Sequence, residues 1–233
     1  MKTIGLIGGM SWKSTVTYYQ IINEVISERL GDLHSAKCLL YSVDFQEIKE
    51  FQEKNDWDNC GIILAEAAAK LEKSGADFIV ICTNTMHKVI ESIKKCISVP
   101  VLHIAEIMNE KLKEDKINNI ALLGTKYTMQ ENFYKSILIE NGITVLTPAQ
   151  EDMERINSII FDELCLGIIS EETKNEFLRI VRYLISDGAE GIILGCTEIG
   201  LLLQQEDISI PLYDTTKVHA TMAALHSIGI EDI

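Results

Sequence analysis

The chain has 233 residues, a hydrophobic content of 47% and a formal net charge of −14. This length accommodates one large domain or two small ones, and the negative charge argues against nucleic-acid or anionic-membrane partners, because both attract basic surfaces. The N-terminal apolar run is too short for a signal peptide or a membrane span. Six scattered cysteines without a Cys-x-x-Cys pair indicate a reduced, cytoplasmic setting rather than a disulfide framework or a zinc site.

Short apolar strands alternate with helical patterns through the first half of the chain. Ser11 is a plausible N-cap for the first helix, and the stretch 44–58 is polar without a clear period. The expected strands are 2–7, 38–43, one ending at Cys82 or Thr83, and one opening with 99–103; the expected helices are one starting after Ser11, then 61–73, 85–95 and 106–113.

The second half of the chain repeats this alternation of strands and helices. The expected strands are 119–125, 143–147, 191–196 and 209–214, and the expected helices are 128–141 and 171–186; the matching points are Gly8 with Gly124, Gly75 with Gly188, and Pro100 with Pro211. Strands alternating with helices imply parallel sheets, whose ligands bind at the carboxyl ends of the strands. We therefore predict an α/β protein of two pseudo-symmetric, Rossmann-like lobes with the active site between them. The expected boundaries are 1–98 with 208–233 for the first lobe and 99–207 for the second, with the C-terminal helix packing on the first.

Two apolar strands, one in each half, end in clusters of small polar side chains. The second cluster contains Cys196, which ends its strand and precedes Thr197 and Glu198 at a possible helix start. Amides at a helix start lower a thiol pKa from about 8.5, so Cys196 is a candidate functional thiol. The cysteines at 38, 60, 96 and 165 are expected to be small core residues.

The first cluster can be aligned with the second in two ways. Pairing the two Cys-Thr dipeptides makes Cys82 the counterpart of Cys196, whereas an ungapped alignment from the preceding Gly-Ala-acid sequences makes Thr83 the counterpart. Side chains alternate between the two faces of a strand, so Cys82 and Thr83 should not both point to one cleft. This argument favours Thr83 and keeps Cys82 as its rival.

Other motifs point less clearly to chemistry. The glycines of 5–10 do not fit the G-x-G-x-x-G dinucleotide pattern, and Trp12 replaces the glycine of a phosphate loop, although a turn whose amides face an anion remains reasonable. His87 follows Thr83 by one helical turn, which allows a contact, although a satisfied surface or core histidine is at least as reasonable. No His, Asp and Glu cluster has metal-ligand spacing, and no G-x-S-x-G elbow supports hydrolase chemistry.

Taken in order, Gly8-Gly9-Met10, Asn84-Thr85-x-His87 and Gly195-Cys196-Thr197-Glu198 resemble the aspartate/glutamate racemase family over essentially the whole chain. The resemblance implies racemisation without pyridoxal phosphate, metal or any other cofactor, by two residues that act on opposite faces of the amino-acid α-carbon. It also implies a homodimer and a small-molecule amino-acid substrate. It makes Thr83 (or Cys82) and Cys196 the catalytic pair, and the substrate-binding residues Met10, Gln52, Asn84, Thr85, Thr125, Thr128, Thr197 and Glu198.

The sequence departs from the family at two points. The family motif has cysteine where Thr83 stands, and a hydroxyl is a far poorer base than a thiolate, so we expect unequal efficiency in the two directions or weak activity. Aspartate-selective relatives also carry an arginine after the second strand and a lysine in the second lobe. Here 44–52 offers only Lys49 with neutral Gln46 and Gln52, and 158–170 has no basic residue. A weak dicarboxylate racemase or a broad-specificity racemase is therefore expected.

Thr83 also makes a second class of function credible. A non-catalytic amino-acid-binding or sensing protein could use the same scaffold after losing the first thiol. A one-cysteine decarboxylase is a third reading. Exchange of the substrate α-proton separates the racemase from the binding protein, whereas binding alone does not.

Overall fold

A computed structural model describes residues 1–230, which form two compact units. The first unit comprises Met1–Ile107 and the chain from Thr216 onward, and the second comprises Met108–Thr215. Each unit contains a parallel four-stranded sheet, in the orders β2-β1-β3-β4 and β6-β5-β7-β8. The two orders are equivalent, as the internal repeat predicted, and they confirm the α/β class. Within residues 1–230, no helix combines the length and the apolar character needed to cross a membrane.

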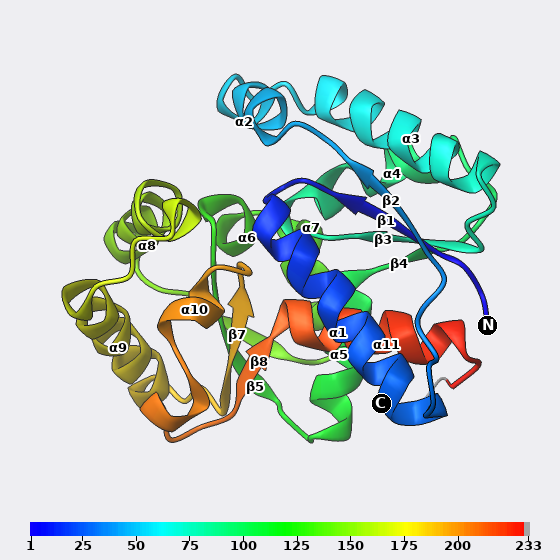
Figure 1. Cartoon of the computed structure of the whole chain (residues 1–233). Coiled ribbons are helices and arrows are strands. Elements are labelled where there is room, and N and C mark those ends of the chain that lie inside the picture. The colour runs from blue at the N-terminus through cyan, green and yellow to red at the C-terminus, as the bar shows by residue number, and fades with distance from the viewer. Residues whose placement is uncertain (231–233) are drawn as a thin grey trace. The chain divides into compact units, whose positions relative to one another are not determined.

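The elements of the first unit follow the expected strand-helix alternation (Figure 1). They are β1 (Ile4–Gly8), α1 (Trp12–Leu30), β2 (Cys38–Ser42), α2 (Phe45–Glu53), α3 (Trp57–Lys73), β3 (Phe78–Ile81), the 3₁₀ helix η1 (Thr85–Val89), α4 (Ile90–Lys94), β4 (Val101–Leu102), the start of α5 (Ile104–Glu114) and α11 (Thr215–Ser227). Ser11 is the N-cap of α1, as expected.

Helices cover both faces of the first sheet, because its central strands are apolar on both sides. On one face α1 and α11 pack against the strands (Figure 1), through the buried residues Ile4, Leu6, Tyr18, Ile22, Ile26, Phe78, Val80, Cys82, Ala220, Ala223 and Ala224. On the other face α3 and α4 pack through Ile7, Leu64, Ala68, Ile79, Ile81 and Ile93 among others. The C-terminal helix therefore belongs to the first unit, as expected.

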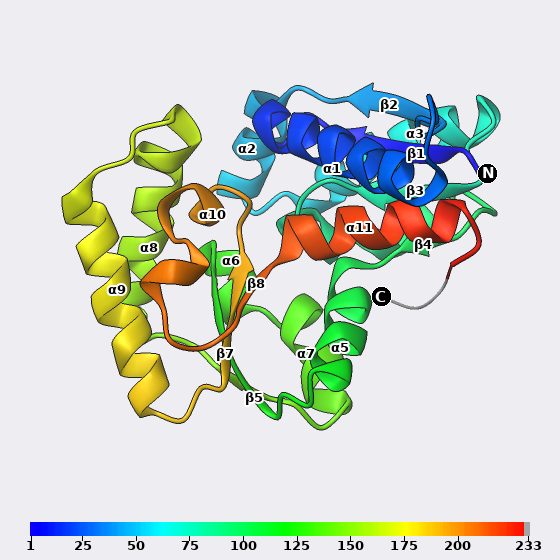
Figure 2. The ribbon, with the colours of Figure 1, turned by 60° about the horizontal axis from the view of Figure 1, so that its bottom comes forward.

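The second unit has the same plan with more helices. Its elements are the rest of α5, β5 (Asn119–Gly124), α6 (Lys126–Gln130), α7 (Asn132–Glu140), β6 (Thr144–Leu146), α8 (Gln150–Asp162), η2 (Leu164–Leu166), α9 (Glu171–Ser186), β7 (Gly191–Gly195), α10 (Ile199–Leu202), η3 (Gln205–Asp207) and β8 (Leu212–Asp214). Figure 2 shows α8, α9 and α10 on one side of this sheet and α7 on the other. The former bury a core that includes Ile156, Ile160, Phe177, Ile180, Ile192, Leu194 and Cys196.

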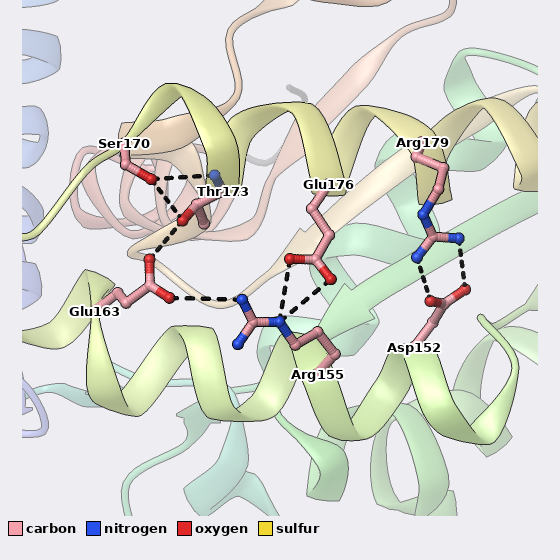
Figure 3. A network of polar contacts seen from close by, with 7 residues as sticks. All are labelled: Asp152, Arg155, Glu163, Ser170, Thr173, Glu176 and Arg179. Atoms are coloured by element: carbon pink, nitrogen blue, oxygen red, sulfur yellow. Dashed lines mark hydrogen bonds and ion pairs between the residues drawn. The ribbon is translucent and has the colours of Figure 1, made fainter.

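A polar network joins α8 to α9 on the surface of the second unit (Figure 3). The Arg155 Nε atom donates to both carboxylate oxygens of Glu176, at 3.1 and 3.2 Å, and Arg179 pairs with Asp152. Glu163 accepts a hydrogen bond from the hydroxyl of Thr173. Both arginines of the network are thus engaged by carboxylates.

The structure differs from the sequence expectations in several elements. The polar stretch 44–58 contains α2 and the start of α3, and α8 lies in a region where no helix was expected. The helix expected at 85–95 is η1 followed by α4, and the helix expected at 128–141 is divided into α6 and α7. Residues 99–107 lie in the first unit, because β4 pairs with β3, whereas 208–215 lie in the second, because β8 pairs with β7.

Candidate active site

The first unit holds a tight turn between β1 and α1. A side chain at Gly9, whose φ is +99°, would lie 2.2 Å from the carbonyl oxygen of Val43, so only glycine fits there. The Gly9 amide donates to the Thr15 hydroxyl at 2.9 Å, which closes the turn onto α1. Met10 follows the turn and is buried in the core beneath it. The turn thus places Met10 beside the end of β1.

The end of β3 separates Cys82 from Thr83. Cys82 is fully buried on the face covered by α1 and α11, and burial raises the pKa of its thiol. Thr83 comes next and is half-buried. The alternation of side chains along β3 therefore leaves Cys82 in the core, enclosed and protonated at neutral pH.

The residues after Thr83 form a buried polar turn at the end of β3. Asn84 and Thr85 are buried, and Gln52 of α2 reaches this turn, with its Nε2 atom 3.1 Å from the Met86 sulfur. The structure thus brings Gln52 to the first motif, Thr83–His87, although Gln52 and Met86 are 34 residues apart in the chain. Gln46, in contrast, is exposed and bonds Glu50 of its own helix.

In the second unit, the ends of β5 and β7 lie side by side. Gly124 pairs with Gly195 in register, so Thr125 and Cys196 leave the sheet at the same edge. A side chain at Gly195 would lie 2.8 Å from the Leu123 carbonyl oxygen, which shows how closely these strand ends approach. Four of the predicted residues of this unit, Thr125, Thr128, Cys196 and Glu198, are buried there.

The side chains of this edge hydrogen-bond to one another. The Thr125 hydroxyl caps α6 by accepting from the Thr128 amide, and the two hydroxyls are 3.3 Å apart. The Cys196 thiol donates to Glu198 Oε2 at 3.1 Å, and the Thr197 hydroxyl donates to the same oxygen. Burial raises the pKa of the Cys196 thiol well above its ordinary value, and the neighbouring Glu198 charge raises it further.

This pKa direction differs from the expectation for Cys196. The helix that follows, α10, is only Ile199–Leu202 and starts after Glu198, so burial outweighs any stabilisation of a thiolate by helix amides. The resting side chain is therefore a thiol bonded to a carboxylate. Glu198 is the group that can accept its proton.

A set of buried side chains lies behind the first motif, and sequence reasoning gave no role to His219 and Tyr18 of this set. His103 at the start of α5, His219 of α11 and Tyr18 of α1 are buried together with His87. They come from elements far apart in the chain, so only the single-turn spacing of His87 from Thr83 signalled the group. In residues 1–230 no group of three or more His, Cys, Asp and Glu side chains has the arrangement of a metal site.

Comparison with known proteins gives a consistent result. The family model for Asp/Glu/hydantoin racemases matches residues 7–223. The broad-specificity amino-acid racemase RacX of Bacillus subtilis (strain 168) is 28% identical over 222 residues, which are 91% of this chain and 92% of RacX. These matches span nearly the whole chain.

Solved structures give the same answer. A candidate Asp/Glu racemase from Yersinia pestis is 49% identical with a TM-score of 0.92, and the match covers 98% of this chain and all of that one. An aspartate racemase homologue from Pyrococcus horikoshii OT3 is 35% identical with a TM-score of 0.85 and the same coverage. The descriptions of these relatives name racemases, and none favours a non-catalytic binding protein. The resemblance, the fold class and the racemase class predicted from the sequence are confirmed: the chain belongs to the Asp/Glu/hydantoin racemase family.

Proposed function

We propose that this racemase interconverts L- and D-amino acids without a cofactor, with Cys196 as the residue that removes the α-proton. The observation that carries the proposal is the buried Cys196 thiol, hydrogen-bonded to the Glu198 carboxylate at the end of β7. Few arrangements can remove a weakly acidic carbon-bound proton, and a thiolate formed beside its own proton acceptor is one of them.

The proton transfers follow from this pair. The thiol proton passes to Glu198, and the Cys196 thiolate then takes the α-proton of the amino acid, whose C–H electrons move toward the substrate carboxylate. The hydroxyls of Thr125, Thr128 and Thr197 are proposed to bind that carboxylate and to stabilise the charge that develops on it. Reversal of the same steps returns the proton to the starting face.

Inversion requires a proton from the opposite face, and we assign that role to Thr83, with Asn84 and Thr85 binding the substrate. Its hydroxyl can give a proton to the carbanionic intermediate, and solvent water then returns a proton to Thr83 while Glu198 releases the one it holds. A neutral hydroxyl is a poor base for the reverse removal. The burial of Cys82 in the core supports Thr83 over its rival.

Thermodynamics limits how far the rates of the two reaction directions can differ. The two enantiomers have equal free energies, so kcat/KM must be the same in both directions. The inequality is expected in kcat and KM taken separately, and in the rate at which each enantiomer exchanges its α-proton. The enantiomer whose α-proton faces Cys196 exchanges faster.

For the substrate we propose a broad range of amino acids or a weak preference for dicarboxylates. The side chain that reaches the first motif from α2 is the neutral Gln52, while Lys49 of the same helix pairs with Glu53 at 3.6 Å. In the second unit, Arg155 is engaged by Glu176. A second substrate carboxylate bound beside Gln52 would thus meet a neutral amide rather than a cation, which weakens its selective binding. Met10 is proposed to line the same site.

The test is α-proton exchange in deuterated water, followed by NMR on separate L- and D-amino acids with acidic and neutral side chains. Exchange and inversion of at least one acid are expected, with unequal exchange rates for its enantiomers, and Cys196→Ala should abolish both. Binding without exchange for every acid would overturn the racemase and favour the binding protein. Turnover of aspartate and glutamate alone would overturn the broad range.

We also propose that the enzyme is a cytoplasmic homodimer. Trp12, Val16 and Tyr19 are 65%, 54% and 54% exposed at i, i+4 and i+7 of α1, an apolar stripe that association of two copies would cover. Within residues 1–230, no disulfide joins any of the six cysteines, which suits a reducing compartment. Light scattering should give a dimer that Val16→Asp converts to a monomer, while cell fractionation tests the compartment.

A further inference from the structure

The structure links the first motif to a buried imidazole. The Nδ1 atom of His87 lies 2.9 Å from the carbonyl oxygen of Thr83 and 3.3 Å from that of Asn84. Its Nε2 atom lies 3.3 Å from the Ile104 amide at the start of α5. Because Nε2 faces an N–H donor, the ring must carry its proton on Nδ1 and donate it to the two carbonyls.

The surroundings of His87 hold the ring in this neutral form. His103 and His219 approach it with ring centroids at 4.7 and 5.9 Å, and all three side chains are buried. His219 is itself fixed, because its two nitrogens bond the Tyr18 hydroxyl at 2.8 Å and the Leu102 carbonyl at 3.0 Å. Burial lowers the pKa of all three histidines, and the charges they would carry lower it further for His87. An imidazolium would therefore lose one hydrogen bond and face two neighbouring rings.

We propose that His87 is a positioning residue for Thr83: its Nδ1–H bond to the Thr83 carbonyl fixes the turn that presents the Thr83 hydroxyl to the substrate. The inference rests on the proposed function of Thr83. His87 does not touch the reacting atoms, and it acts through the main chain of the residue that does. A small shift of that main chain misplaces the hydroxyl, and misplacements of about 1 Å can cost two orders of magnitude in rate.

Two substitutions of His87 distinguish the hydrogen bond made by Nδ1 from the one made by Nε2. In His87→Asn the amide nitrogen can take the place of Nδ1 and keep the bond to Thr83, while the contact with Ile104 is lost. In His87→Gln the longer side chain can keep the Ile104 contact but loses the donor near Thr83. His219→Gln is the matched control, because it removes a buried ring of the same cluster that bonds Tyr18 and Leu102 rather than the Thr83 turn.

The first readout does not depend on activity. Hydrogen–deuterium exchange of a peptide covering 82–90 is expected to rise in His87→Gln and to stay near the wild-type level in His87→Asn and in His219→Gln. Unchanged protection of this peptide in His87→Gln would overturn the proposal. So would equal loss of protection in both His87 variants.

The second readout is the inversion rate of each variant, measured together with the melting temperature of that variant. His87→Gln is expected to lower kcat about tenfold or more with little change in KM, while His87→Asn keeps kcat within about threefold of wild type. If kcat instead falls in step with melting temperature across all three variants, His87 is only a core residue and the proposal fails. A wild-type enzyme that inverts no amino acid would overturn the proposed function, while the exchange of the peptide would still decide the positioning role.

Discussion

The Cys196 thiol and the Glu198 carboxylate meet at 3.1 Å at the end of β7, so the candidate base and the acceptor of its proton are only two residues apart. Glu198 has two opposing effects on this thiol. Its charge raises the pKa of Cys196, which disfavours the thiolate, and its oxygen accepts the proton that must leave. The effects can be separated by replacing the carboxylate with an amide.

Glu198→Gln is expected to lower the pKa of Cys196 and yet to slow α-proton exchange by about tenfold or more. Alkylation of Cys196, followed by mass spectrometry over a pH series, should shift to lower pH, because the negative charge is gone. Glu206→Gln, on the exposed first turn of η3, is the control and should change neither quantity. A faster-exchanging Glu198→Gln enzyme would contradict the role of Glu198 as proton acceptor.

Thr83→Cys is expected to raise kcat for the slower direction by roughly an order of magnitude, because a thiol replaces a poor acid–base group. Chiral chromatography of reactions started from each enantiomer measures this. Cys82→Ala should leave the direction of preference unchanged and lower stability by about 1–2 kcal/mol, since Cys82 is a core side chain. Loss of inversion in Cys82→Ala at an unchanged melting temperature would restore Cys82 as the rival.

The buried histidines predict acid sensitivity of the fold. Burial lowers the pKa of His103 to about 4 and that of His219 to about 3, against an ordinary value of 6.5. Between pH 6.5 and these lowered pKa values, the unfolded chain binds more protons than the folded one. The free energy of unfolding therefore falls as the pH drops below 6.5. This stabilisation is complete above 6.5 and is lost progressively toward pH 4 and 3.

Urea unfolding at a series of pH values measures this loss. His219→Gln removes one of the titrating groups, so its free energy of unfolding should fall less steeply with decreasing pH than that of the wild type. The difference between the two slopes is at most about 1.4 kcal/mol per pH unit. The comparison cancels the carboxylates that titrate in the same range. Parallel curves for the two proteins would mean that His219 is not held neutral in the folded state.

Gly195→Ala tests the close approach of β5 and β7. The new Cβ would lie 2.8 Å from the Leu123 carbonyl and 3.2 Å from the Thr128 side chain, so it must displace backbone next to Cys196. We expect a loss of about 1–3 kcal/mol in stability and a larger loss of exchange activity. Gly200→Ala is the control, because the nearest atom there is an oxygen of the Asp214 side chain, which can move.

Much of this fold could be predicted because each half carries the same local signals. Apolar strands that end in glycine and polar residues revealed the repeat, and the equivalent sheet orders confirm it. The element β4 shows the limit. This strand is only Val101–Leu102, and it belongs to the first unit because it pairs with β3. That pairing joins residues distant in the chain, so no local sequence pattern predicts it.

In the site as well, features set by neighbouring residues could be predicted, whereas features set by contacts between distant residues could not. Alternation along β3 continues to Cys82, which lies in the core with Phe78 and Val80, because burial on one face of a strand is a local property; the role of Thr83 stays a prediction. The pKa of Cys196 was expected in the wrong direction, because it depends on enclosure and on the position of Glu198 rather than on the helix start. Of the histidines behind Thr83, His219 was missed because α11 and β3 are joined only by folding.

The inclusion of α11 in the first unit has a consequence for how the protein is made. Ala220, Ala223 and Ala224 of α11 cover a sheet whose strands β1 to β4 are synthesised before the second unit, which is one continuous segment, 108–215. The second unit can therefore complete its core while one apolar face of the first still lacks its last helix. The strands β1 to β4 are thus synthesised before the second unit but complete their packing only after it, when α11 is made.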